Sequence, residues 1–320
     1  MPGTAPKRAA PNAGLPGAAG LSRVSSLEDV RQATDGSFRC CVLASGSTGN
    51  AVYVEAGSTA LLVDAGVGIR KLQGALREIG VVPDGLDALL VTHEHHDHVR
   101  GLPFVVRRFG LPVYTSQGTW SELCAGMEDV AKPRFIAAGR PFALGEMVIE
   151  PFALSHDAAE PLGFVFHAFG RKLVLATDLG YVSAKNRDVT RGAHTYIVEA
   201  NHDVEMLRAG PYPWHLKRRI LGDKGHLSND SAAEYLLDVV TEATARVFLA
   251  HLSEENNRPE VALAVVDRLF ADAGGTATEG ILLTLTHPRA ATELVTVCER
   301  GSHPHARLLP GAKRTLNQEF

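Results

Sequence analysis

Several apolar segments of this chain stop abruptly at a histidine or an aspartate, and this recurrence limits the fold more than any other feature of the sequence. The residues at or just after these segments are Asp64, His93, His156, Asp178 and His251. A single histidine after a strand is an ordinary loop residue, but repeated delivery of metal-type ligands to strand ends is hard to explain by chance. Helical patterns over 213–221, 229–242 and 259–270 alternate with the strands. The pattern therefore predicts packed sheets with helices on the outside.

The densest strand end is Thr92-His93-Glu94-His95-His96-Asp97-His98, which follows the apolar run 87–91. If the backbone is extended there, His93 and His95 project to the same side. Asp97 and His98, around the following bend, can serve a second ion. Imidazole suits zinc, manganese and iron, and a carboxylate adds the negative charge that lets two cations lie close together. The motif predicts half of a two-metal site, and the alternative is a solvated loop that binds metal adventitiously.

Asp64 ends another predicted strand, 59–63, at a place where the chain should approach the histidine motif. A loop aspartate often caps a helix. It can also accept a hydrogen bond from the far nitrogen of an imidazole and so orient that ring toward a metal. Both interpretations of Asp64 stay open from the sequence.

The composition limits the classes of function. The chain has 320 residues, enough for a full core, and its net charge of −4 provides no global basic field that would recruit nucleic acid. Its cysteines show neither Cys-x-x-Cys spacing nor a disulfide framework, which favours a cytoplasmic location and argues against thiolate ligands. No apolar stretch approaches the ~20 residues that span a bilayer, so no membrane association is predicted.

Order is predicted to begin near residue 38. Residues 1–37 are rich in Ala, Pro and Gly and cannot bury enough surface to offset the entropy of ordering, so we expect a disordered extension. Residues 38–300 are expected to form a single domain. Residues 301–320 are expected to form a polar, poorly ordered tail.

A short basic segment precedes His226 in this otherwise mildly acidic chain. It contains Lys217, Arg218, Arg219 and Lys224. These cations, together with a helix N-terminus near Ser228, suit a phosphate backbone. The alternative for such a charge run is a solvated helix face. Its position directly before a His-x-Ser element favours the first interpretation, a local basic patch that meets a phosphate backbone.

Two groups of residues carry a resemblance to a known family. The first is the pattern His-x-His-x-Asp-His at His93, His95, Asp97 and His98; the second, in motif order, is Asp64, His156, Asp178 and His251. With them the sequence resembles the metallo-β-lactamase fold superfamily from about residue 38 to 295. The resemblance implies an α+β fold, a four-layer αββα sandwich with its active site at one edge of the two sheets.

Longer stretches narrow the resemblance. Segments 44–50, 199–203, 210–214, 225–229 and 251–257 are similar to the YycJ/WalJ group of bacterial proteins. Members of that group are regarded as DNA-processing nucleases, and they are related to RNase Z and to the phosphodiesterase PhnP. The resemblance therefore implies a nuclease.

The resemblance also implies ligands for two divalent ions per chain, zinc or manganese. One ion would take His93, His95 and His156, the other Asp97, His98 and His251, with Asp178 bridging the two. His96 stands where relatives often have a small polar residue, and Leu179 where RNase Z has threonine. Neither departure removes a ligand, and His96 is expected to point away.

His226 resembles the RNase Z histidine that lies near the scissile phosphate. This implies that His226 stabilises the developing charge or protonates the leaving oxygen and does not bind metal. Asp97 and His226 are thus the expected catalytic residues. Asn201 and His202 follow a predicted strand that ends toward the site. Each residue can contact the substrate or can form hydrogen bonds within a turn, and the sequence leaves both alternatives open.

The leading hypothesis is a binuclear phosphodiester hydrolase, a DNA-processing exonuclease that uses a metal-bridging hydroxide as nucleophile. A small-molecule phosphodiesterase of the PhnP kind would fit the low positive charge better. A thioester or lactam hydrolase would use the same metals but would not need the basic segment. The choice of metal, DNA versus RNA, cleavage polarity and oligomeric state stay open.

Overall fold

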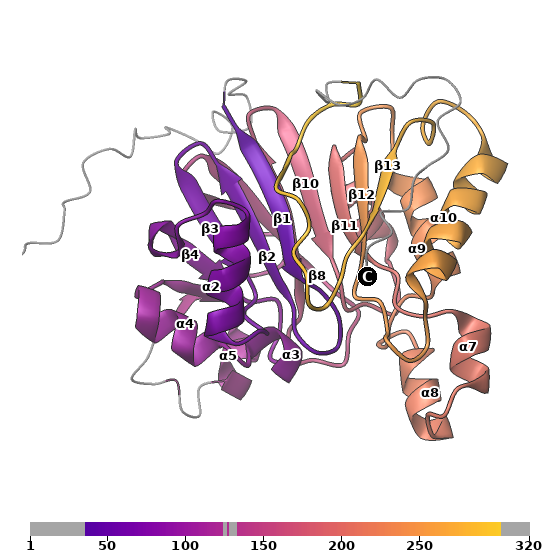
Figure 1. Cartoon of the computed structure of the whole chain (residues 1–320), viewed down its shortest axis with the longest axis horizontal. Coiled ribbons are helices and arrows are strands. Elements are labelled where there is room, and N and C mark those ends of the chain that lie inside the picture. The colour runs from indigo at the N-terminus through magenta and orange to yellow at the C-terminus, as the bar shows by residue number, and fades with distance from the viewer. Residues whose placement is uncertain (1–35, 124–126, 128–132, 302–320) are drawn as a thin grey trace, which may run out of the picture.

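The structure of the chain, a computed structural model, describes residues 36–123, 127 and 133–301. The predicted extension 1–37 and tail 301–320 lie almost entirely outside the described residues. The described residues form two sheets of seven strands each, packed face to face, with helices on both outer faces (Figure 1). This arrangement confirms the predicted αββα sandwich.

The first sheet is built mainly from the N-terminal half of the chain. Its strands are β1 (Phe38–Ala44), β2 (Ala51–Ala56), β3 (Thr59–Val63), β4 (Ala88–Leu90), β5 (Val113–Thr115), β6 (Pro133–Phe135) and β14 (Val295–Thr296). Their spatial order is β14-β1-β2-β3-β4-β5-β6. Strands β1 to β3 form an antiparallel meander, and β3 to β6 run parallel.

The second sheet repeats this plan. Its strands are β7 (Phe142–Leu144), β8 (Met147–Ala153), β9 (Leu162–Ala168), β10 (Arg171–Ala176), β11 (Thr195–Glu199), β12 (Arg246–Ala250) and β13 (Leu282–Leu285). Strands β7 to β10 are antiparallel neighbours, and β10 to β13 run parallel in sequence order. Because neighbouring parallel strands end at the same edge, each sheet delivers several strand ends to one side of the molecule.

The helices cover both outer faces. Those on the first sheet are α2 (Ile69–Glu78), the 3-10 turn η1 (Pro83–Gly85), α3 (His96–Val99), α4 (Leu102–Phe109) and α5 (Gln117–Leu123). Those on the second are α6 (Ala184–Thr190), α9 (Asn229–Val239) and α10 (Pro259–Ala273), while α7 (Val204–Ala209) and α8 (Trp214–Ile220) project beyond the sheets (Figure 1). The sequence did not predict α6 and α7, which have 7 and 6 residues.

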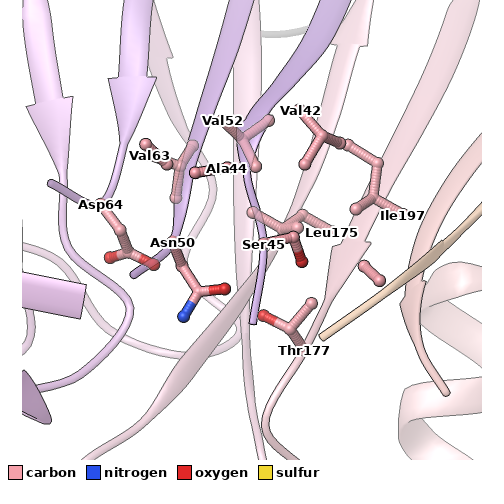
Figure 2. A pocket seen from close by; sticks show the side chains of 12 residues that line it. Val42, Ala44, Ser45, Asn50, Val52, Val63, Asp64, Leu175, Thr177 and Ile197 are labelled. Carbon is pink, nitrogen blue, oxygen red and sulfur yellow. The ribbon is translucent and has the colours of Figure 1, made fainter. Parts of the chain in front are cut away.

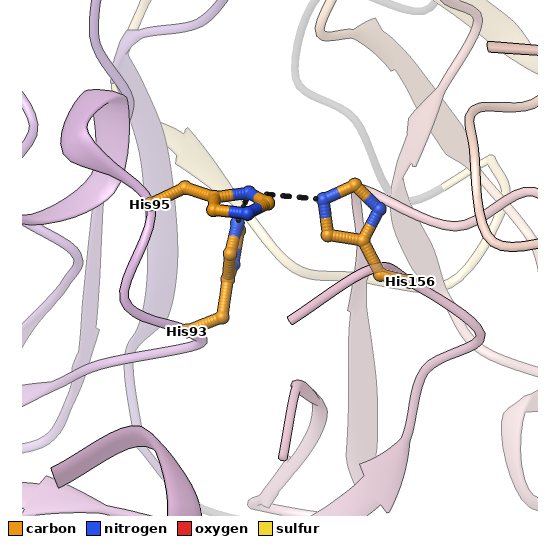
Figure 3. A group of neighbouring side chains, drawn as sticks. All are labelled: His93, His95 and His156. Carbon is orange, nitrogen blue, oxygen red and sulfur yellow. Dashed lines mark hydrogen bonds between the residues drawn. The ribbon is translucent and has the colours of Figure 1, made fainter. Parts of the chain in front are cut away.

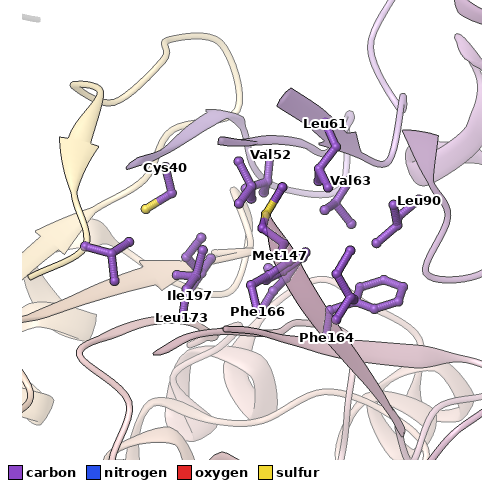
Figure 4. Packing of buried hydrophobic residues seen from close by; sticks show 14 of the residues in the cluster. Cys40, Val52, Leu61, Val63, Leu90, Met147, Phe164, Phe166, Leu173 and Ile197 are labelled. Carbon is purple, nitrogen blue, oxygen red and sulfur yellow. The ribbon is translucent and has the colours of Figure 1, made fainter. Parts of the chain in front are cut away.

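Alternate residues of one strand face two different cores. In β1, Val42 faces the space between the sheets and Leu43 faces the helices. The central core contains Val63 from the first sheet and Phe164 and Phe166 from the second (Figure 4). Strands that are buried on both faces appear in the sequence as continuous apolar runs. The shared core fixes the two sheets against each other, so their strand ends keep a constant spacing.

The remaining sequence expectations concern membranes and thiols. None of the described helices combines the length and the apolar character that a bilayer crossing requires. Cys40, Cys41 and Cys298 are buried free thiols. Cys124 lies outside the described residues.

Candidate metal centre

The candidate ligands meet at one edge of the sandwich because several parallel strands end there. Asp64 and His93 follow the paired strands β3 and β4, and Asp178 and His251 follow β10 and β12 on either side of β11. The φ angles of Asp64, Asp178 and His251 are 62°, 63° and 53°. Left-handed backbone is uncommon outside glycine and is concentrated at functional sites. The chain therefore turns sharply where these three side chains enter the site.

Three imidazoles form the first cluster (Figure 3). The Nδ1 atom of His95 lies 3.1 Å from the Nε2 of His93 and 3.2 Å from the Nε2 of His156. Burial lowers the pKa of His93 and of His156, so both rings stay neutral at pH 7. The nitrogen atoms of these neutral rings converge on one point. This arrangement favours coordination of a cation over hydrogen bonds between the rings. The first predicted ligand set is therefore assembled in one place.

The second cluster contains two imidazoles and two carboxylates. The Nε2 of His98 lies 3.4 Å from Asp97 Oδ2 and 3.2 Å from Asp178 Oδ2. The Nε2 of His251 lies 3.5 Å from the same Asp97 oxygen and 3.4 Å from Asp178 Oδ1. Asp178 also groups with His93 and His98, with ligand atoms within 4.8 Å of one another. Asp178 therefore lies against the second cluster and within ligand distance of His93 of the first.

Buried negative charge dominates the electrostatics of the centre. Burial would raise the pKa of Asp178, but His251 and His98 hold it well below its ordinary value. Burial would likewise lower the pKa of His98, but the carboxylates of Asp178 and Asp64 raise it well above its ordinary value. The 3.2 Å contact to Asp178 Oδ2 is not aligned as a hydrogen bond, and this oxygen has no other partner among the described residues. The carboxylates thus require positive charge here, which divalent cations can supply.

In several candidate ligand histidines, the ring nitrogen that does not face the centre contacts a carboxylate or carbonyl oxygen. The Nδ1 of His98 lies 2.7 Å from Asp64 Oδ2, and Asp64 also accepts hydrogen bonds from the backbone and hydroxyl of Thr92, both at 2.9 Å. The Nδ1 of His156 lies 3.2 Å from the carbonyl oxygen of Gly225. Such contacts set the tautomer and direct Nε2 toward a metal. The geometry of Asp64 favours the orienting role over helix capping, since Gly68 is the cap residue of the following helix α2.

A buried carboxylate, Glu199, joins two histidines of the site. Its Oε1 lies 2.7 Å from the Nδ1 of His226 and 3.0 Å from the Nδ1 of His251. Its Oε2 accepts hydrogen bonds from the backbone N–H groups of Leu179 and Leu227 at 3.1 and 3.3 Å. Glu199 was not predicted as a site residue from the sequence. The available signal was that Glu199 ends the apolar strand β11, as other site residues end theirs.

The His226 ring lies at the mouth of the centre. Its side chain is 20 % exposed, whereas Glu199 is fully buried. Its centroid is 5.2 Å from the ring of His156 and 5.3 Å from the ring of His251. Burial would lower the pKa of His226, but Glu199 raises it above its ordinary value. Because Nδ1 faces Glu199, Nε2 is the ring nitrogen that Glu199 leaves free.

Asn50 holds Asp97 from the opposite side and was also missed. Its Nδ2 donates a hydrogen bond to Asp97 Oδ2 at 3.1 Å, and its backbone N–H donates to the Asp97 carbonyl at 2.8 Å. Gly66 approaches that carbonyl so closely that an added Cβ would lie 1.6 Å from its oxygen. Asn50 and Asp97 are 47 residues apart in the sequence, so no local pattern predicts their contact.

Two of the predicted phosphate contacts are used within the protein. The Lys217 side chain is buried, and its ammonium donates hydrogen bonds to the carbonyls of Arg208 and Gly210 at 2.6 and 2.7 Å. Arg219 pairs with Asp157, the residue after a candidate ligand. The structure therefore contradicts a substrate contact by Lys217, because its ammonium already closes the turn between α7 and α8.

The other predicted contacts differ in their surroundings. Arg218 and Lys224 are exposed, and neither forms an ion pair in the described part of the chain. Ser228 caps α9 by accepting a hydrogen bond from a backbone N–H of its first turn. Asn201 is buried and donates to the carbonyl of His251 at 2.9 Å. Arg218 and Lys224 are thus exposed, whereas Ser228 and Asn201 are buried and bonded within the protein.

Two further histidines lie outside the clusters. His96 is exposed and belongs to none of the candidate metal groups of the described residues. His202 is 1 % exposed, and in the described part of the chain neither ring nitrogen has a hydrogen-bond partner. Burial lowers the pKa of His202 to about 4, so this ring is neutral at pH 7.

A small cavity lies between the sheets next to the centre (Figure 2). Val42 and Ile197 belong to its apolar wall, and Asn50, Asp64 and Thr177 supply polar atoms. Its volume of ≈ 10 Å³ is about that of one water-sized sphere. This cavity is therefore too small to hold a substrate.

Residues 59–252 match the family described as the Beta-lactamase superfamily domain. The chain belongs to this superfamily. Exodeoxyribonuclease YycJ of Bacillus anthracis is 41% identical to it over 255 residues, which are 79% of this chain and 97% of that protein. Exodeoxyribonuclease WalJ of Streptococcus pneumoniae serotype 2 (strain D39) is 41% identical over 243 residues, 74% of this chain and 90% of that one. These matches confirm the predicted YycJ/WalJ group.

The solved structures agree on the fold. The metallo-β-lactamase fold protein YhfI from Bacillus subtilis superposes with a TM-score of 0.60 at 17% identity, covering 81% of this chain and 99% of that one. At this identity the likeness shows the fold alone. As a member of the superfamily the chain is a metal-dependent hydrolase, and its His/Asp clusters indicate divalent metal binding.

Proposed function

We propose that this chain is a two-metal phosphodiester hydrolase that shortens DNA from its ends. The observation that carries the proposal is that Asp178 lies within ligand distance of histidines of both clusters, beside the pair Glu199 and His226. Two cations joined by a carboxylate suit in-line displacement at phosphorus, because they stabilise both the attacking and the leaving oxygen. The names of the relatives, exodeoxyribonucleases, support DNA as the substrate.

The clusters define which residues would hold the metals. The proposed ligands are His93, His95 and His156 for one ion, Asp97, His98 and His251 for the other, and Asp178 for both. Zinc and manganese both suit this donor set. When bound, the two ions supply an activated hydroxide and neutralise charge on the phosphate. Asp64 and Asn50 keep His98 and Asp97 in place for this task.

His226 is placed to assist the leaving group. Glu199 accepts the hydrogen bond from His226 Nδ1, which fixes the ring and leaves its Nε2 to donate toward the departing oxygen. Glu199 also holds His251, so the proton donor and a proposed metal ligand keep a fixed separation of 5.3 Å between ring centroids. Such fixed spacing lowers the cost of reaching the reactive geometry.

The surface around the centre favours a polyanion. Arg218 and Lys224 are exposed near His226 in a chain of net charge −4. A lactam or thioester substrate would not use these cations. A small phosphodiester would need at most one of them, and the overall negative charge of the chain is the one observation that favours such a substrate.

The deciding experiment offers the metal-reconstituted enzyme four substrates in parallel: end-labelled duplex DNA, single-stranded DNA, RNA and bis-p-nitrophenyl phosphate. We expect the end label to be released from DNA first, with slower turnover of the small diester. An internally labelled duplex distinguishes exonuclease action from internal cutting. Exclusive turnover of the small diester would overturn the nuclease proposal.

A further inference from the structure

The helical hairpin α7–α8 exposes an aromatic side chain at the edge of the sandwich that carries the candidate metal centre. Both helices project from the sandwich at the edge where α3 begins (Figure 1). Trp214, the first residue of α8, is 63 % exposed, whereas the other tryptophan of the chain, Trp120, is half-buried on α5. A single exposed apolar residue needs no explanation, so the neighbours of Trp214 decide what its exposure means.

Trp214 is part of an exposed stripe along α8. Arg218 and Leu221 follow it by four and seven positions, so all three lie on the same face of the helix, and all three are exposed. In the described part of the chain neither Trp214 nor Arg218 makes a side-chain hydrogen bond, ion pair or ring contact. Lys217 and Arg219, on other faces of α8, are bound within the protein. The helix thus presents an aromatic ring and a guanidinium that the fold itself does not use.

The C-terminal end of α8 is tied to the metal centre. The backbone N–H of His226 donates to the carbonyl of Ile220 at 3.0 Å, and the carbonyl of Gly225 lies 3.2 Å from His156 Nδ1. Trp214 stands six residues before Ile220, which is about 9 Å along the helix axis. At about 3.4 Å per nucleotide of a stacked strand, that distance is two to three nucleotides.

A second exposed aromatic ring, Tyr181, stands at the near end of α8. It is 52 % exposed and follows Gly180. Gly180 packs so tightly against the loop after α8 that an added Cβ would lie 2.2 Å from the carbonyl oxygen of Gly222. Tyr181 is also only three residues after Asp178. Trp214 thus begins α8, and Tyr181 follows the glycine that packs against the loop after α8.

We propose that α8 and Tyr181 form a binding track for single-stranded DNA, in which a base stacks on Trp214 and Arg218 contacts a neighbouring phosphate. The inference rests on the proposed nuclease function and specifies its substrate form. Aromatic faces combined with cations bind single strands without sequence preference, because every base has a π-face. A blunt duplex end keeps its bases stacked and paired, so the track requires an unpaired segment of a few nucleotides that leads to His226.

Tryptophan fluorescence tests the stacking directly. The variant Trp120→Phe leaves Trp214 as the sole tryptophan of the full-length, metal-loaded protein. A phosphorothioate-linked oligothymidine resists cleavage during the titration. We expect saturable quenching by the single strand and little quenching by a blunt duplex of equal length. Equal quenching by both, or none by the single strand, overturns the proposal.

Substitution of Trp214 supplies the second measurement. We expect Trp214→Ala to raise the Kd for single-stranded DNA by about 5- to 100-fold, on the scale of one lost base stack. Trp214→Phe keeps a ring and should stay within about threefold of the parent. Phe104→Ala removes a similarly exposed ring, 57 %, from α4 and serves as the matched control without effect. An unchanged Kd for Trp214→Ala overturns the proposal. So does a dimer, seen by sedimentation, that dissociates on this substitution, because the stripe would then join two copies.

The outcomes separate this inference from the proposed function. If the parent hydrolyses DNA, but Trp214→Ala binds and cleaves single strands as the parent does, only the track is overturned. If no phosphodiester is hydrolysed under any metal, but Trp214 is quenched by the single strand alone, the track stands as a binding site and the nuclease proposal fails.

Discussion

The Nδ1 of His226 lies 2.7 Å from the Oε1 of Glu199, and the same carboxylate oxygen lies 3.0 Å from the Nδ1 of His251. One buried carboxylate thus holds the proposed proton donor and a proposed metal ligand at once. A change at Glu199 should therefore disturb proton transfer and metal geometry together, whereas a change at His226 should disturb only the first.

Glu199→Gln should lower kcat about 100-fold and lower the Tm by several degrees. An amide has one acceptor oxygen, so it cannot accept from the two imidazoles and from the N–H groups of Leu179 and Leu227 together. Each buried donor left unpaired costs about 1–3 kcal/mol. Turnover of bis-p-nitrophenyl phosphate and thermal unfolding measure the two effects. Glu205→Gln, exposed on α7, is the matched control, and parent-like values for Glu199→Gln would contradict the role.

His226→Ala should keep both metals and lose about 10²- to 10⁴-fold in kcat, the usual scale of a positioned general acid. Its Nδ1 faces Glu199, and its ring belongs to the mouth of the centre. Elemental analysis gives the metal content, and single-turnover kinetics gives the chemical step. His96→Ala, which removes an exposed imidazole of the same motif, should change neither. Loss of metal from His226→Ala would show that the ring is a ligand.

Asp178→Ala should deplete the metal, because both proposed ions lose the shared carboxylate. We expect the bound metal to fall by at least half and the turnover to fall with it. Circular dichroism establishes that the variant is folded, and Asp188→Ala, exposed on α6, controls for loss of a carboxylate. Full metal occupancy in folded Asp178→Ala protein would rule out the bridging role. Chelation of the parent should likewise abolish turnover, and zinc or manganese should restore it.

Arg218→Ala and Lys224→Ala should each weaken the salt dependence of DNA binding. Each phosphate contact contributes about 0.7–0.9 to the slope of log K against log salt, so each variant should be less steep by about that amount. Arg77→Ala, an exposed arginine at the end of α2, should keep the parent slope. Parallel slopes for all four proteins would remove these two side chains from the DNA contact.

His202 should make the protein less stable in acid. Burial lowers its pKa to about 4, and Glu199, Asp203 and His226 act on the same ring. Between about pH 6.5 and 4 the unfolded chain binds a proton that the folded chain does not, so the free energy of unfolding decreases as the pH falls, by up to about 3 kcal/mol. His202→Gln should flatten this dependence in urea unfolding from pH 7.5 to 4.5. Identical pH dependence in both proteins would contradict the prediction.

Some of the candidate site could be predicted from the sequence because it depends on strand ends. His156, Asp178 and His251 each follow an apolar run, and parallel strands bring such ends to one edge. Glu199 also ends an apolar strand. It was not predicted because a glutamate at a strand end is usually a solvated carboxylate. Asn50 followed no rule, since its contact with Asp97 joins two loops 47 residues apart.

The basic segment shows where sequence reasoning reaches its limit. Lys217 and Arg218 are adjacent and carry the same charge, yet Lys217 closes a turn and Arg218 faces solvent. Which cation is available depends on how α8 packs against the end of α7, because the carbonyls of Arg208 and Gly210 accept from Lys217, and no local propensity encodes that packing. The hairpin helix α7, of 6 residues, was not predicted either.

The sequence by itself determined the two-sheet architecture, the order of the strands along the chain and the set of strand-end imidazoles and carboxylates. These follow from apolar periodicity and from residue chemistry, both of which are local. Only the tertiary structure decided that Glu199 joins His226 to His251, that Asn50 holds Asp97, and that Trp214 is left in solvent. Those relationships depend on packing between segments far apart in the chain, where distances of a few tenths of an ångström decide which groups meet.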